Sequence, residues 1–313
     1  MPFLITARYI IAFICLSSAY GSKPELDSRR CTTQLNIEPN MLRGLYMSPY
    51  DQTESGVYGN IIVDQAKTDI LINFIEKHSI NSLSLYDLRH ILSDPSLIEH
   101  LAHFIRRARK HGVKEVIAIG STIESFYRIQ NYLNTCNDDA GFNGLLTEIE
   151  FWAGPEHQQQ YKKFVSFLDE MRSLGVQFNG KKLSIHAYLG WLKDSPGSSA
   201  TEKAREIARL VDRIYLHSYV RRGDQAFPKA KARMYNLVEG NANVDIVPIL
   251  SAEGPQHHSD MPFQGEYFRT NGIETGEAMY REEFAADPVI AGSNVFLAGF
   301  QYYEYRYLGR CLG

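Results

Sequence analysis

The sequence predicts an α/β fold of the (β/α)8 TIM-barrel type, built as a single domain. Short apolar segments alternate with amphipathic helical segments along almost the whole chain, a pattern typical of parallel βαβ units. Eight apolar segments favour closure into a barrel over an open sheet, and the roughly 290 residues that follow the N-terminal segment suit one such barrel. The first strand ends in Ser48-Pro49-Tyr50 rather than in a glycine-rich phosphate loop, which argues against an open doubly wound sheet.

The predicted elements follow one another with short connections. The strands are expected at Arg43–Ser48, Ile80–Tyr86, Lys114–Gly120, Gly144–Phe151, Leu183–Leu189, Arg213–Tyr219, Asp245–Leu250 and Asn294–Gln301. The helices are expected near Val63–His78, Ser96–His111, Thr122–Thr135, Glu156–Leu174, Ala200–Leu210, Pro228–Leu237 and Glu277–Ala286. The eighth helix is expected to be missing or reduced to Arg306–Gly309. The segment Ala252–Thr270, rich in Gly, Pro, His and Ser, is expected to form a loop over the active face.

The first twenty-one residues are predicted to be a signal peptide rather than part of the fold. Arg8 supplies a positive start, residues 9–16 are apolar, and small residues offer cleavage after Ala19 or Gly21. The apolar run is shorter than the ~20 residues needed to span a bilayer, and a membrane anchor or lipidation of Cys15 are the alternatives. We therefore expect a secreted or periplasmic protein with no stable membrane insertion after cleavage. Residues 22–40 would form an N-terminal extension and residues 41–313 the barrel.

Charge and cysteine placement add two expectations. The net charge is −3 and the basic residues are scattered, so nucleic acid is not expected as a partner, and no cofactor is expected. Cys31 lies just before the first predicted strand and Cys311 just after the last. Those strands are neighbours in a closed barrel, so a Cys31–Cys311 disulfide is expected in an oxidising compartment.

Alternation along the strands predicts which side chains point into the barrel. In the fifth predicted strand Leu183 to Leu189 form an apolar set at every second position, which suits packing under helices and leaves the residues between them inside. The same reasoning gives the inward set Tyr46, Ser48, Tyr50, Ser84, Tyr86, Glu148, Glu150, Trp152, Ser184, His186, Tyr188, Tyr215, His217, Tyr219, Ser251 and Glu253. In a barrel of this kind the active site lies at the C-terminal ends of the strands.

Two glutamates on one face of a buried strand, Glu148 and Glu150, are the strongest functional signal. Burial and like charge both raise a carboxyl pKa, so at least one of the two should stay protonated near neutrality, as a general acid requires. The structural alternative is an internal salt bridge, for which few basic residues are predicted to face inward. A functional glutamate pair is therefore favoured.

The stretch Phe142-Asn143-Gly144-Leu145-Leu146-Thr147-Glu148-Ile149-Glu150 resembles the strand-four signature of family 18 glycoside hydrolases, the chitinase-like barrels. The resemblance implies that Glu150 is the catalytic acid and that Glu148 takes the place of the aspartate beside it. The segment from Val211 to Tyr219 is similar to strand six of that family, which implies that Tyr219 binds the acetamido group of the substrate. Three positions depart from the pattern: Leu146 replaces the first aspartate, Thr147 an aliphatic residue and Val220 an aspartate. No tryptophan closes the last strand.

A glycoside hydrolase acting on a carbohydrate, such as a glycan with N-acetylhexosamine units, is the leading hypothesis. Glu150 would protonate the glycosidic oxygen, Glu148 would orient an acetamido nucleophile, and Tyr219 would hold its oxygen. In a variant of this mechanism Glu253 would be the nucleophile. The residues expected to contact substrate are Tyr46, Tyr86, Trp152, His186, Tyr188, Trp191, His217 and Glu253, of which Trp152, Trp191, Tyr46 and Tyr86 could stack on sugar rings.

Two other functions stay open on the sequence. A metal-dependent hydrolase or isomerase could use His186, His217, Glu148 and Glu150 as ligands of a divalent ion. A catalytically inactive carbohydrate-binding barrel would explain the missing aspartate at Leu146, although the retained Glu150 argues against it.

Overall fold

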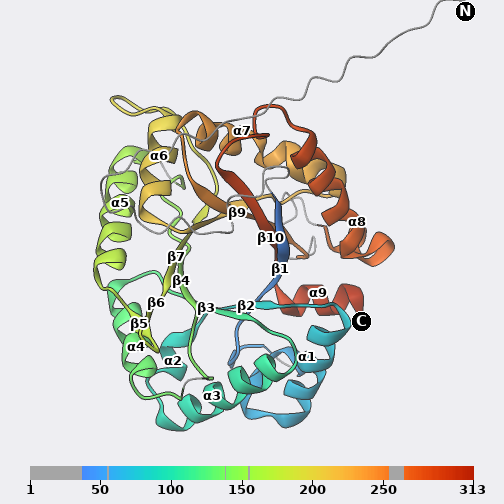
Figure 1. The fold of residues 1–313 in the computed structure, drawn as a ribbon. Helices are drawn as coiled ribbons and strands as arrows, with labels where there is room; N and C mark the ends of the chain where they lie inside the picture. The colour runs from blue at the N-terminus through green and yellow to red at the C-terminus, as the bar shows by residue number, and fades with distance from the viewer. Residues whose placement is uncertain (1–36, 55, 138, 154–155, 254–263) are drawn as a thin grey trace, which may run out of the picture. The chain divides into compact units, whose positions relative to one another are not determined.

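The computed structural model describes residues 37–54, 56–137, 139–153, 156–253 and 264–313, and in them the chain forms a closed parallel barrel surrounded by helices (Figure 1). Its strands are β1 (Ile37–Met47), β2 (Ser82–Leu85), β3 (Glu115–Ile119), β4 (Gly144–Thr147), β7 (Ser184–Leu189), β8 (Arg213–His217), β9 (Val244–Ser251) and β10 (Val295–Tyr303). They pair in the order β1-β10-β9-β8-β7-β4-β3-β2, so the predicted (β/α)8 TIM barrel is confirmed.

The helices that cover the barrel are α1 (Gln65–Lys77), α2 (Leu88–Ile91), α3 (Pro95–Lys110), α4 (Ile123–Leu133), α5 (His157–Ser173), α6 (Ala200–Leu210), α7 (Ala226–Glu239), α8 (Gly265–Ala286) and α9 (Tyr305–Leu312). Short 3-10 turns lie at Gly56–Tyr58, Ile61–Val63 and Gly223–Gln225. Side-chain caps fix where several helices begin: Thr122 and Ser199 form capping boxes at α4 and α6, and Asp64 accepts two backbone N–H groups at α1. No helix among the described residues is long and apolar enough to cross a bilayer.

Several features of the fold differ from the prediction: β1 begins at Ile37, inside the predicted N-terminal extension, and the short helix α2 was not expected. β4 ends at Thr147, so both glutamates follow the strand instead of lying in it. An antiparallel hairpin of β5 (Gln177–Phe178) and β6 (Lys181–Lys182) precedes β7 and was not expected. The loop predicted over Ala252–Thr270 is wrong at its C-terminal end, because α8 begins at Gly265; glycines inside this helix, including Gly272 in the left-handed region (φ 75°), weaken its helical pattern in the sequence.

Several predictions fall outside the described residues. These are the signal peptide at residues 1–21, residues 22–36 of the N-terminal extension, Cys31, and residues 254–263 of the predicted loop.

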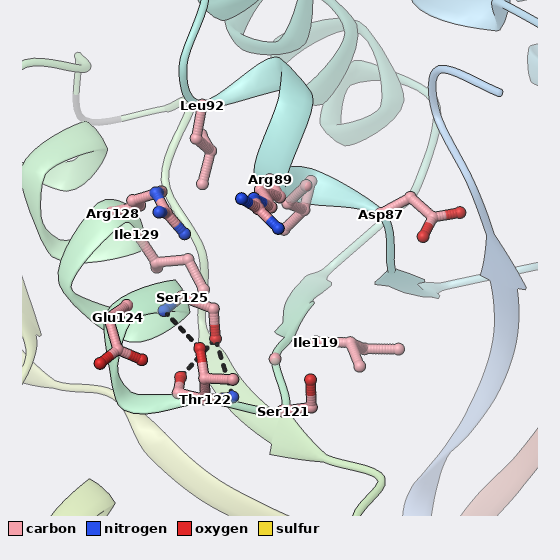
Figure 2. A pocket seen from close by; sticks show the side chains of 12 residues that line it. Asp87, Arg89, Leu92, Ile119, Ser121, Thr122, Glu124, Ser125, Arg128 and Ile129 are labelled. Carbon is pink, nitrogen blue, oxygen red and sulfur yellow. Dashed lines mark hydrogen bonds between the residues drawn. The ribbon is translucent and has the colours of Figure 1, made fainter. Parts of the chain in front are cut away.

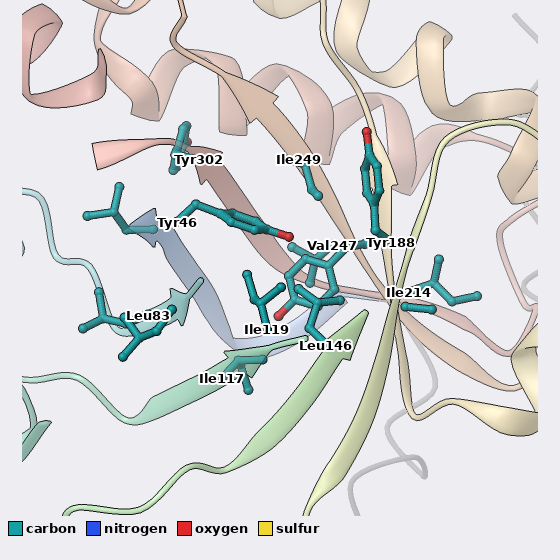
Figure 3. Close-up of a cluster of buried hydrophobic side chains, with 14 of the residues drawn as sticks. Tyr46, Leu83, Ile117, Ile119, Leu146, Tyr188, Ile214, Val247, Ile249 and Tyr302 are labelled. Carbon is teal, nitrogen blue, oxygen red and sulfur yellow. The ribbon is translucent and has the colours of Figure 1, made fainter. Parts of the chain in front are cut away.

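The barrel interior is filled by side chains up to its C-terminal end. Figure 3 shows apolar and aromatic groups from most strands packed together, among them Tyr46, Ile117, Ile119, Leu146, Val247 and Ile249. All six are at most 9% exposed. Space for a ligand is therefore confined to the mouth of the barrel.

A buried ion pair crosses the N-terminal part of the barrel. Arg213 on β8 donates to Glu115 on β3 at 2.8 Å, and Ser82 on β2 donates to the same carboxylate oxygen at 3.2 Å. The two charged side chains are only 14% and 15% exposed. Since β3 and β8 are not neighbours in the barrel, both side chains must point inward. Arg213 is therefore a basic residue that points into the barrel, where the sequence analysis predicted few basic residues.

Removing one member of this pair tests its role in stability. In Glu115→Ala the Arg213 guanidinium stays buried without its carboxylate, so we expect the free energy of unfolding to fall by about 3 kcal/mol. Urea unfolding followed by circular dichroism measures the loss. The exposed pair between Glu76 and His111 is the control, and Glu76→Ala should cost less than about 1 kcal/mol. Equal small losses in the two variants would contradict the role assigned to the buried pair.

Candidate active site

A cavity of about 520 Å³ lies at the C-terminal ends of the barrel strands. It is lined by Tyr46, Glu148, Glu150, Trp152, Tyr188, Trp191, His217, Tyr219, Ile249, Glu253 and Tyr303. Nine of these were among the residues singled out from the sequence, and they come from strands that are far apart in the chain. Barrel closure therefore brings all the predicted catalytic and substrate-binding residues except Tyr86 and His186 around one cavity.

Glu148 and Glu150 reach this cavity from the extended segment that continues β4 beyond Thr147. Alternation persists through that segment, so both carboxyl groups point to the same side. Burial raises the pKa of Glu148 to about 7, and the charge of Glu150 adds to the rise. The neighbouring Tyr46 hydroxyl opposes part of it, although the two groups do not meet in good hydrogen-bond geometry. Burial also raises the pKa of the more exposed Glu150.

His217 and Tyr188 form a hydrogen-bonded pair on the wall of the cavity. Nδ1 of His217 lies 2.7 Å from the Tyr188 hydroxyl, and the ring centroid of Tyr219 lies 4.1 Å from that of the histidine. Burial, with the nearby charges of Arg233 and Lys229, lowers the pKa of His217 to about 3. The histidine is therefore neutral at physiological pH and contributes hydrogen bonding instead of positive charge.

Trp191 forms the rim of the cavity and is held by two cationic groups. Lys229 Nζ lies 4.5 Å and Arg233 Cζ 5.0 Å from the centre of its ring system. The Arg233 guanidinium also donates to the backbone carbonyls of Gly190, His217 and Lys229, so it ties the residue before Trp191 to the end of β8 and to α7. Burial lowers the pKa of Arg233 to about 10. Trp191 is 38% exposed, so it offers an aromatic face at the entrance.

The other aromatic side chains are less accessible. Trp152 is 7% exposed and Tyr46 is completely buried, so neither presents a full ring face to a sugar. Trp152 packs edge-on against Tyr188 with ring centroids 5.3 Å apart, and a side chain at position 190 would collide with it, which explains Gly190. Trp152 and Tyr188 therefore shape the wall of the cavity, and Tyr46 contributes its hydroxyl.

Glu253 supplies a third carboxyl group to the cavity from the end of β9. Its side chain accepts a hydrogen bond from Ser251 Oγ at 2.8 Å, and its backbone N–H donates to the same hydroxyl at 3.2 Å. These contacts hold the carboxylate in one orientation. Among the described residues that line the cavity, no lysine or arginine balances the three glutamates.

Two predicted contact residues lie outside the lining. Tyr86 donates its hydroxyl to Glu304 at 2.6 Å, and Arg306 binds the same carboxylate at 2.9 Å. His186 is 1% exposed and packs against Tyr215 deeper in the barrel, where burial lowers its pKa well below the ordinary value. The residues proposed for a metal site are therefore not assembled, and no group of three or more His, Cys, Asp or Glu in the described chain is placed to hold a metal ion.

Tyr303 is a site residue that was not predicted from the sequence. The last strand was expected to end at Gln301, but β10 continues to Tyr303. Extending the alternation from Gln301 by one step would have placed Tyr303 at the mouth. Its ring lies edge-on to Tyr46, with centroids 5.6 Å apart, and so completes the wall between β1 and β10.

Cys311 lies in α9, where its Sγ is 4.0 Å from the carbonyl oxygen of Ala252. Its predicted partner Cys31 is outside the described residues, so the disulfide stays a prediction.

Solved structures resemble this fold. GH5_18 from Streptomyces cattleya, in complex with GlcNAc, matches with a TM-score of 0.51 and 13% identity over 84% of this chain and 71% of that chain. A Group IV chitinase from Ostrinia furnacalis matches with a TM-score of 0.48 and 10% identity, over 86% and 93% of the two chains. The ICChI chitinase from Ipomoea carnea matches with a TM-score of 0.43 and 13% identity, over 85% and 95%. No protein-family profile and no curated protein sequence matches the chain. At these identities the first likeness shows a shared barrel fold.

The raised pKa of Glu148 predicts how stability depends on pH. Between the ordinary value of 4.5 and about 7 the folded state holds more protons at this group than the unfolded state, so stability falls as the pH rises through this range. Glu148→Gln removes that term. The melting temperature of this variant, relative to wild type, should therefore be higher at about pH 8 than at about pH 5. Tyr46→Phe removes the hydroxyl that opposes the rise in the pKa of Glu148. The loss of stability between about pH 5 and about pH 8 should therefore be larger in Tyr46→Phe than in wild type. A difference in melting temperature between Glu148→Gln and wild type that stays constant with pH would contradict the raised pKa of Glu148.

Proposed function

We propose that the protein is a glycoside hydrolase that cleaves a glycan in the cavity at the barrel mouth, with Glu150 as the general acid. The observation that supports this most directly is the convergence of Glu148, Glu150 and Glu253 on one cavity with aromatic walls. Glycoside hydrolysis needs a carboxylic acid that stays protonated and a second group that stabilises the developing positive charge. Burial favours the protonated form of Glu148 and Glu150, and no basic side chain of the described lining pairs with the three glutamates.

In the proposed reaction the Glu150 carboxylic acid donates its proton to the glycosidic oxygen as the bond to the anomeric carbon breaks. The carbonyl oxygen of an N-acetyl group on the substrate attacks that carbon, and Glu148 orients this acetamido group. Tyr219, which also lines the cavity, would donate a hydrogen bond to the same group. Water, deprotonated by Glu150, then opens the intermediate and restores the acid. Glu253, held by Ser251, is the alternative nucleophile for a substrate without an acetamido group.

A carbohydrate-binding barrel without activity is the second candidate, and one observation favours it. Leu146 is completely buried in the barrel below Glu148, at the position where the family 18 signature has its first aspartate. Glu148 therefore has no carboxyl group behind it to share its proton. The same cavity could bind sugars without cleaving them.

Export to the periplasm or to the exterior is part of the proposal. It is supported by the sequence of residues 1–21, with a charged start, an apolar stretch and small residues at two cleavage positions. The disulfide between Cys31 and Cys311 would form in the same compartment.

Glu150→Gln tests the acid. The amide cannot donate the required proton but has nearly the same shape, so hydrolysis should fall by at least about 100-fold while the fold is kept. The assay is release of sugar from a panel of chromogenic glycosides and insoluble glycans, including N-acetylglucosamine polymers. Glu170→Gln, at an exposed position on α5, is the matched control and should retain full activity. Full activity of Glu150→Gln would exclude Glu150 as the acid. Binding of a glycan by a wild-type chain that cleaves nothing would favour the inactive barrel.

Trp191→Ala tests the aromatic rim. The indole face contacts a sugar outside the bond that is cleaved, so its loss should raise KM by about 10-fold and leave kcat within about 2-fold. Steady-state kinetics on the glycan identified above measures both constants. Tyr127→Ala removes an aromatic side chain that is 51% exposed on α4 and does not line the cavity, so it should change neither. A fall in kcat with KM unchanged would place Trp191 in the chemical step instead.

A further inference from the structure

A second cavity, of about 440 Å³, lies on the same face of the barrel, where β2 and β3 end (Figure 2). One wall is α2, which directly follows β2, and the other is the first part of α4, which follows β3. The reaction proposed above uses none of its residues. We call it the arginine cleft, because Arg89 from α2 and Arg128 from α4 both line it.

The two arginines converge on one space, and neither has a hydrogen-bonded or ion-paired partner among the described residues. Figure 2 shows their guanidinium groups directed toward the same space from opposite walls. Neither group forms a hydrogen bond or ion pair with any described residue, and Arg89 is exposed while Arg128 is half-buried. Two like charges that face each other are unfavourable unless an anion lies between them. Guanidinium groups bind planar or tetrahedral oxyanions through paired N–H donors.

The acidic side chains of the cleft, Glu124 and Asp87, do not supply the anion between the two guanidinium groups. Glu124 interacts with its own backbone N–H and with Thr122 at the start of α4, which lowers its pKa, and it feels Arg128 more weakly. The pKa of Asp87 is raised by burial and by Asp51, a residue outside the cleft. Figure 2 shows both carboxylates directed away from the space between the arginines. That space keeps a positive potential, and the exposed Ser121 also lines the cleft.

The arginine cleft adjoins the catalytic cavity. Asp87 lines the cleft, and its charge contributes to the raised pKa of Glu148 in the cavity. Glu148 directly follows β4, and β4 is the barrel neighbour of β3, which ends at the cleft. A sugar chain held at the glutamates can therefore continue along the barrel rim into the cleft. The described lining of the catalytic cavity contains three glutamates and no lysine or arginine, so an acidic sugar is disfavoured there and favoured only in the cleft.

We propose that the arginine cleft binds a carboxylate or sulfate group of the glycan, on a sugar outside the one that is cleaved. The substrate class is then an acidic glycan that presents a neutral unit to Glu150 and a uronic acid or sulfated unit to Arg89 and Arg128. The identity of the bound molecule as a glycan rests on the proposed function. The recognition of an oxyanion by the two arginines does not.

Calorimetric titration tests the proposal in a Glu150→Gln background, which prevents turnover. The probes are tetragalacturonate, its uncharged analogue galactotetraose, and inorganic sulfate, all at low ionic strength. We expect tetragalacturonate to bind at least about 10-fold more tightly than galactotetraose, and Arg89→Gln or Arg128→Gln to weaken it by about 10-fold each. Arg128→Lys keeps the charge but not the paired donors, so its affinity should lie between those of wild type and Arg128→Gln. Arg209→Gln, an exposed arginine on α6, changes net charge equally and should leave binding intact.

The outcomes distinguish a glycan from a free anion as the ligand, and they test the oxyanion site separately from the proposed hydrolase. Tighter binding of tetragalacturonate than of sulfate, lost in the arginine variants, supports a glycan as the ligand. Equal binding of both, lost in the same variants, supports the oxyanion site but overturns its assignment to a glycan. Unchanged affinity in the Arg89→Gln/Arg128→Gln double variant, with thermal unfolding as in wild type, overturns the site. Binding through the arginines, together with a wild-type chain that cleaves no glycan in the panel, upholds the cleft and overturns the hydrolase.

Discussion

The pairing of the first strand with the last is the constraint on which the site depends. β1 and β10 run parallel from Leu42 opposite Gly299 to Leu45 opposite Tyr302. Gly299 is required because a side chain there would meet the backbone of Leu42 at about 2 Å. Arg43 reinforces the seam through two hydrogen bonds to Glu277, whose carboxylate also accepts from Tyr302. Without this closure the glutamates that follow β4 would not face the aromatic groups of β1 and β10 across one cavity.

Electrostatics divides the barrel along its axis. Near the N-terminal end of the strands Arg213 is paired with Glu115, so the charge there is balanced and serves the fold. At the mouth the glutamates have no cation beside them in the described lining, and burial raises the pKa of Glu148 and Glu150. Positive charge lies behind Trp191, where Lys229 and Arg233 pack, and to one side of the mouth, in the arginine cleft. One end of the barrel therefore carries a balanced ion pair, and at the other end burial favours the protonated form of Glu148 and Glu150.

The sequence predicted the barrel and most of the cavity because both follow from local periodicity. Alternation within each strand assigns a side chain to a face, and a closed parallel sheet brings all C-terminal strand ends together. The same rule, applied one step further, would have found Tyr303, and it places Arg213 inside with Tyr215. That Arg213 meets Glu115 on a distant strand is a tertiary contact, which no local pattern contains. The positions of Arg233 and of the arginine cleft could not be predicted for a similar reason. These arginines lie on helices, and the face that a helix turns toward the barrel mouth is fixed by tertiary packing.

A crystal structure of the Glu150→Gln variant with an N-acetylglucosamine oligomer tests the central claim most directly. The account predicts a sugar chain across the cavity, with a glycosidic oxygen within hydrogen-bond distance of the side chain at position 150. It also predicts an acetamido group between Glu148 and Tyr219, and a sugar ring on Trp191. An oligomer bound elsewhere on the barrel, or in this cavity with no glycosidic oxygen near position 150, would contradict it.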